Sequence, residues 1–220
     1  MSQQQKEQKA LPNGSSSNKT FADLYAHLLT LAPPLTPPSH PTVPGLTAAI
    51  ASLGVHPALE VALHLLNNDL PSAHFLVRHM HAAPAFEGMF LHGILHRIEG
   101  DFDNARAWYA DVAKSEVYET VWPPGKDGAK GEDGQSMTGG KSGGVRFVDE
   151  VEAWVKRREG EESALEEKSV AEIKRVVEFV SAKFGTEVWP DATSEWASPS
   201  GDASKIQEQM ILGDRGFRRF

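Results

Sequence analysis

Residues 92–105 read HGILHRIEGDFDNA and contain signals for the end of one helix and the start of another. Gly100 follows a run with helical spacing, and a glycine just past the last helical residue is a common stop signal. Asp101 comes next, with Asn104 three residues on, which is typical of a residue that caps the start of a new helix. The stretch therefore predicts two helices joined by a tight turn, with Arg97 paired to a carboxylate of that turn.

A similar segment occurs 32 residues earlier. Residues 67–73 (NNDLPSA) align with residues 99–105 (EGDFDNA), and each segment lies between two stretches whose apolar residues recur at helical spacing. The predicted helices run from about 57 to 66, 69 to 80, 84 to 98 and 101 to 112. We therefore predict an all-α fold, a short stack of antiparallel helical hairpins whose helices approach closely at small residues.

The second copy resembles a tetratricopeptide repeat, which is a pair of antiparallel helices. The first copy departs from the family because Val61 stands where a small residue is usual. The offset of 32 also departs from the family's period of about 34, and a histidine takes the usual aromatic position in both copies. The residues that carry the resemblance are Gly93, His96, Gly100, Asp101, Phe102, Ala105 and Tyr109.

Residues 92–105 also look like a signature, HxxxHRxEGDxxNA, of an uncharacterised helical family of fungal proteins with bacterial relatives. This likeness implies a helical fold and brings no activity with it.

The flanking segments are predicted to cover and complete this helical centre. Six prolines between residues 32 and 45 predict an extended strap. A second strap is expected after residue 185, anchored by Trp189 and Trp196. Further helices are predicted at about 20–31, 46–53, 145–159 and 163–184.

Two polar segments are expected outside the packed centre. Residues 1–19 lack the apolar run of a signal peptide, so we expect a disordered leader. Residues 123–144 contain eight glycines and little apolar material, which predicts a flexible insertion. The remaining residues from 20 to 220 are expected to form a single helical domain.

Charge and composition argue against several classes of protein. The chain has 22 basic and 30 acidic residues, a net charge of -8, whereas nucleic-acid binding draws on a concentrated basic face. It contains no cysteine, which excludes disulfides, thiol nucleophiles and cysteine-ligated zinc. No stretch approaches the roughly 18 apolar residues of a membrane span. We therefore expect no nucleic-acid or membrane partner and a cytoplasmic location, with the nucleus not excluded.

Histidines are crowded in the predicted repeat: seven of the nine lie between residues 56 and 96. His92 and His96 are four residues apart and so share one helix face, with Glu99 a turn further on. His74 lies on the preceding helix, where it could supply a third ligand. Two imidazoles at this spacing with a nearby carboxylate suit one divalent metal with nitrogen and oxygen ligands, and His92, His96, His74 and Glu99 are the candidate ligands.

The alternative for these histidines is a packing role, since His96 stands where a tetratricopeptide repeat has a core aromatic residue. Two functions therefore stay open. In the first, the protein is a non-catalytic helical-repeat protein that binds a protein or peptide partner. In the second, it is a small metal-dependent or histidine-dependent enzyme, a hydrolase or a lyase. The sequence identifies no catalytic residue.

Overall fold

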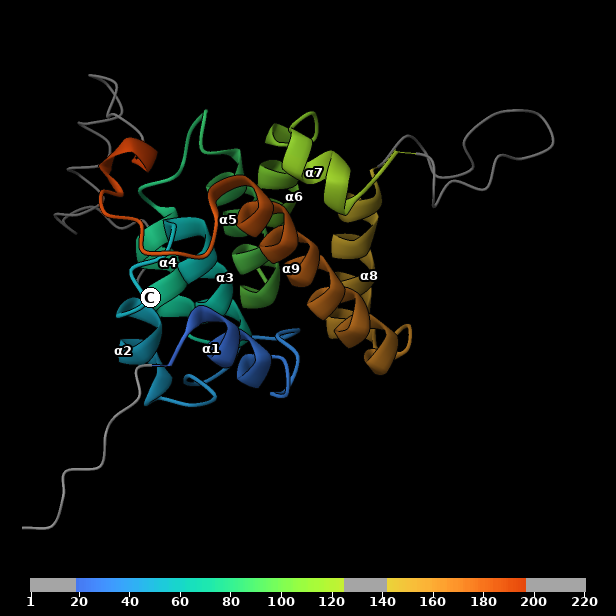
Figure 1. Cartoon of the computed structure of the whole chain (residues 1–220). Coiled ribbons are helices and arrows are strands. Elements are labelled where there is room, and N and C mark those ends of the chain that lie inside the picture. Colours follow the sequence, from blue (N-terminus) through green and yellow to red (C-terminus); the bar gives the residue numbers. More distant parts are fainter. Residues whose placement is uncertain (1–18, 125–141, 197–220) are drawn as a thin grey trace, which may run out of the picture.

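The computed structural model describes residues 19–124 and 142–196, and the fold in these two ranges is all-helical, as the sequence predicts (Figure 1). No strand occurs in either range. The elements are α1 (Phe21–Leu28), α2 (Leu46–Ala51), α3 (Pro57–Leu66), α4 (Leu70–Val77), α5 (Phe86–Glu99), α6 (Phe102–Asp111), α7 (Glu116–Val121), α8 (Gly143–Arg157), α9 (Glu162–Phe184) and a single 3-10 turn, Thr193–Glu195.

The turns between α3 and α4 and between α5 and α6 have the same backbone geometry. In each, the residue before the helix cap has a positive φ, 56° at Asn68 and 83° at Gly100. The amide N–H groups of Asp69 and Asp101 donate to the carbonyl five residues earlier, at 2.8 and 2.9 Å. Each aspartate also accepts a bond from the N–H three residues on, which for Asp101 is that of Asn104. These contacts satisfy backbone groups that a helix end leaves unpaired.

Helix α5 is the centre of the molecule and is buried along almost its whole length. It meets α6 at Gly93, where an added Cβ would lie 2.6 Å from Tyr109 Cδ1 and 3.0 Å from Trp108 Cβ. Such distances leave no room for a side chain, so a glycine is required for the two helices to approach this closely. Helix α9 runs diagonally across the molecule and contacts α3, α7 and α8 (Figure 1).

A buried charge pair joins α5 to α9. The Arg97 guanidinium donates to Glu172 Oε2 at 2.9 Å and to Ser169 Oγ at 3.1 Å. Glu172 also accepts from Tyr109 Oη at 2.7 Å and from Trp122 Nε1 at 2.9 Å. Burial alone would favour neutral arginine, but the Glu172 carboxylate outweighs it and the pKa of Arg97 is raised. This carboxylate therefore joins helices α5, α6 and α9 and the end of α7.

The predicted pairing of Arg97 with a turn carboxylate is wrong. Side chains on a helix tilt toward its N-terminus, so the Arg97 side chain leaves α5 in the direction away from the turn at Gly100. The face on which it lies is covered by α9 and by the Phe147 ring, whose centroid is 4.7 Å from the guanidinium carbon.

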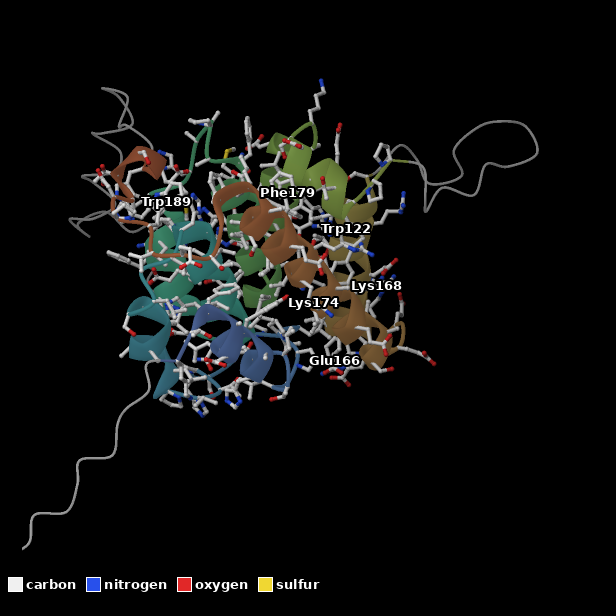
Figure 2. The ribbon with its side chains drawn as sticks, viewed as in Figure 1. Trp122, Glu166, Lys168, Lys174, Phe179 and Trp189 are labelled. Atoms are coloured by element: carbon white, nitrogen blue, oxygen red, sulfur yellow. The ribbon has the colours of Figure 1, made fainter. Side chains whose placement is uncertain are left out.

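Both straps follow the surface in the described residues. In the proline-rich segment, the N–H of Thr42 donates to the carbonyl of Asn67 at 2.8 Å, and Ser169 Oγ donates to the Pro34 carbonyl at 2.7 Å. In the C-terminal strap, the N–H of Trp189 donates to the Gly54 carbonyl at 2.6 Å. Figure 2 places Trp189 beyond the C-terminal end of α9, away from Glu166 and Lys168, which lie near the other end of that helix.

The ends of the predicted glycine-rich insertion need correction. Helix α8 begins at Gly143, capped by Ser142, so the last residues of that segment are helical. An added Cβ on Gly144 would lie 2.5 Å from Tyr118 Oη, which shows close packing there. Residues 125–141 of the insertion and residues 1–18 of the expected leader lie outside the described residues. Helix α7 was not predicted.

None of the helices in the described part of the chain is long and apolar enough to cross a membrane.

Candidate metal centre

Three histidines from two consecutive helices, α4 and α5, converge. His74 comes from α4, and His92 and His96 come from successive turns of α5. One ring nitrogen of each lies within 4.8 Å of those of the other two. The ring centroids are 4.8 Å apart for His92 and His96, 5.2 Å for His74 and His92, and 5.6 Å for His74 and His96. The structure thus brings together three of the four residues that the sequence suggested as metal ligands.

His92 is the least satisfied member of this cluster. Its side chain is buried, and neither Nδ1 nor Nε2 has a hydrogen-bond partner among the residues that the structure describes. Burial, followed by the neighbouring His96 and His74 rings, lowers the pKa of His92 to about 2. The ring is therefore neutral at physiological pH and keeps a free lone pair, which is the form that binds a metal ion.

Glu99 lies beside the cluster and contacts two of its rings. Its Oε2 is 3.0 Å from His96 Nδ1, and its Oε1 is 3.7 Å from His74 Nδ1. The Glu99 side chain is 24% exposed, whereas those of His96 and His74 are 4% and 11% exposed. The carboxylate therefore lies on the solvent side of the histidines. Asp101 is more distant, with Oδ2 4.0 Å from His96 Nδ1, and its side chain caps α6.

The donor set fits a transition metal better than magnesium or calcium, which prefer oxygen ligands. Tetrahedral zinc with Zn–N bonds near 2.0–2.1 Å requires nitrogen atoms roughly 3.4 Å apart. The observed separations of up to 4.8 Å are wider. Closing them requires shifts on the order of 1 Å, which small rotations of the imidazole rings can supply.

The other described histidines of the same region have separate environments. His64 lies 3.2 Å from Asp69 and 3.7 Å from Glu60 through opposite ring nitrogens. His79 bonds the Phe75 carbonyl, and His81 bonds that of Arg78. His56 Nδ1 accepts the N–H of Ala58 at the start of α3, and its ring stacks on Phe184 at 3.8 Å.

Trp108 belongs to this site and was not predicted from the sequence. Its ring stacks on His92 with a centroid separation of 4.4 Å and an interplanar angle of 25°. Trp108 lies on α6, the helix after the one that carries His92. No local signal in the sequence indicates that Trp108 would contact a histidine cluster.

No family model matches this chain, and searches of curated proteins and of solved structures found no similar protein. The resemblance to tetratricopeptide repeats and to the HxxxHRxEGDxxNA signature therefore stays a prediction.

Proposed function

We propose that the protein binds one divalent transition-metal ion, of the type of Zn²⁺, through His74, His92 and His96. The observation that carries this proposal is the buried His92 ring, which faces two further imidazoles and whose two nitrogens have no hydrogen-bond partner in the described ranges 19–124 and 142–196. A buried polar group without a partner costs free energy of about 1–3 kcal/mol. A metal–nitrogen bond removes this cost for one of the two nitrogens.

A bound ion would join two helices that belong to different hairpins. His74 lies on α4, while His92 and His96 lie on α5. Because the three ligands converge only in the folded chain, metal binding stabilises that fold. At a free metal concentration of 100 times the Kd, the free energy of unfolding increases by about 2.7 kcal/mol.

The test is calorimetric titration of untagged, chelator-treated protein with Zn²⁺. The wild type is expected to bind one equivalent, and His92→Phe, which preserves the stack on Trp108, is expected to lose it. His79→Ala is the matched control, because it removes a histidine just after α4 that lies outside the cluster. The absence of stoichiometric binding by the wild type, or equal binding by His92→Phe, would refute the proposal.

Binding of a protein or peptide partner is our second proposal, at a site outside the predicted tetratricopeptide-like stack of α3 to α6. It is supported by an open groove of about 700 Å³ between the proline-rich strap and the α8–α9 connection. Its lining combines apolar and charged groups, as peptide-binding grooves do. The residues that line it are Thr36, Pro37, Trp154, Val155, Arg158 and Glu162.

A groove substitution tests this second proposal. A partner recovered from cell extract by the wild type should be lost with Val155→Glu, which places a carboxylate in the groove. Recovery of the same partner by both proteins would contradict binding at this groove.

A further inference from the structure

We infer that Glu99 is not a metal ligand but the carboxylate that positions the His96 and His74 rings, so that a bound ion keeps one coordination position for water or a small anion. This inference rests on the proposed metal site. It changes the role that the sequence suggested for Glu99, and it defines the class of molecule that can reach the ion.

Glu99 determines the tautomer of His96. A carboxylate oxygen can only accept a hydrogen bond, and Glu99 Oε2 lies 3.0 Å from His96 Nδ1. The proton of neutral His96 is therefore on Nδ1, and the lone pair is on Nε2. An imidazole held in this way has its ligating nitrogen fixed before the ion arrives.

Glu99 also lies close to His74, which comes from α4. The remaining oxygen of Glu99 lies 3.7 Å from His74 Nδ1, and the same shift of about 1 Å that draws the rings around the ion can shorten this distance to a hydrogen bond. One carboxylate can thus orient an imidazole on α4 and another on α5. This arrangement of carboxylate, histidine and metal recurs around zinc sites, where the outer carboxylate raises the basicity of the ligand.

This role of Glu99 leaves a bound ion with fewer protein ligands than its coordination number requires. With its oxygens engaged by two Nδ1 atoms, Glu99 leaves the ion three nitrogen ligands, and zinc takes four. The Trp108 ring that covers His92 is apolar and offers no ligand atom. The side chains of His74 and Glu99 are the more exposed part of the cluster, so solvent can reach the fourth position from their side. Three histidines with an open position is the arrangement found in zinc sites that activate water.

The tautomer can be tested without any metal. Nitrogen-15 NMR of the metal-free wild type should show His96 protonated on Nδ1. Glu99→Ala should remove this preference, and Glu99→Gln, whose side-chain carbonyl still accepts a bond, should retain it. Protonation of wild-type His96 on Nε2, or an unchanged tautomer in Glu99→Ala, would overturn the inference.

Zinc affinity tests the same residue independently. Glu99→Ala should weaken Zn²⁺ binding by about 10–100-fold, the usual effect of removing an outer-sphere partner. Asp103→Asn is the control, because it removes a negative charge from a fully exposed side chain that pairs with Arg106 and not with a histidine. Equal affinity of the Glu99→Ala and Asp103→Asn proteins would overturn the positioning role. If the wild type itself binds no zinc, the proposed function fails, whereas the NMR result still decides the Glu99–His96 contact.

The open position is tested on the cobalt-loaded protein, because the visible spectrum of Co²⁺ changes with its ligands. Addition of azide should shift the absorption bands of the wild type. Bands that stay constant at saturating azide would show that the coordination sphere is closed and would overturn the inference.

Discussion

Replacing Glu172 with glutamine should strongly destabilise the fold, because the substitution leaves Arg97 charged in the interior without a counter-charge. The side chains of both residues are 0% exposed, and their N–O distance is 2.9 Å. Glutamine has nearly the same volume as glutamate, so the change tests the charge and the hydrogen bonds without creating a cavity.

The expected loss in the free energy of unfolding arises from the charged Arg97 side chain, which remains buried after the substitution. Removing one partner of a buried ion pair costs about 3–5 kcal/mol. The amide oxygen of glutamine has two lone pairs and can still accept from both Tyr109 and Trp122, so no further penalty is added for those groups. A loss of this size is a large fraction of the total stability of a domain, which is about 5–15 kcal/mol.

Urea denaturation at 25 °C and neutral pH provides the measurement. If the free energy of unfolding decreases by about 2 kcal/mol per M of urea, the urea concentration at the unfolding midpoint should fall by about 1.5–2.5 M. Adding Arg97→Met to Glu172→Gln removes the unpaired charge and should recover part of that loss. A midpoint shift below about 0.5 M, or a double variant no more stable than the single one, would refute the reasoning.

Two further predictions concern the packing and the pH dependence of the fold. Gly93→Ala should lower the free energy of unfolding, measured in urea, by about 1–3 kcal/mol, because the new methyl group meets the Tyr109 ring. Gly45→Ala is the control: no described atom lies within 4 Å of the added Cβ, so stability should change by less than about 0.5 kcal/mol. Equal effects of the two substitutions would contradict the close approach of α5 and α6. Burial lowers the pKa of His56, although the Glu195 carboxylate acts in the opposite direction. The His56 ring is therefore protonated more readily in the unfolded chain than in the folded one. As the pH falls below about 6.5, the free energy of unfolding should decrease for this reason. His56→Asn should retain the cap but lose less stability than the wild type between pH 7.5 and pH 5.5, and parallel losses would contradict this assignment.

Local signals predicted the helices and turns well. The capping box of Thr20 and Asp23 marks the start of α1, and Gly100 followed by Asp101 marks the end of α5 and the start of α6. These features involve residues close in sequence, so they depend little on the rest of the molecule. Helix α7, which has six residues, was not predicted.

The errors concern contacts between distant segments. Arg97 had carboxylates close by in the sequence, but its partner Glu172 is 75 residues away on α9. The burial of a side chain decides such a pairing, and burial depends on which helix covers that face. For the same reason the spacing of His92 and His96 was informative, whereas the contacts of His74 with them and the stack of Trp108 on His92 depend on how α4 and α6 pack against α5.

X-ray absorption spectroscopy of the protein loaded with one equivalent of Zn²⁺ tests the proposed metal centre most directly. We predict four nitrogen or oxygen ligands near 2.0–2.1 Å, with outer-shell scattering from three imidazole rings. His74→Ala should reduce the imidazole count to two, because His74 is the ligand from α4. A zinc spectrum with no more than one imidazole, or a count unchanged in His74→Ala, would contradict a three-histidine site between α4 and α5.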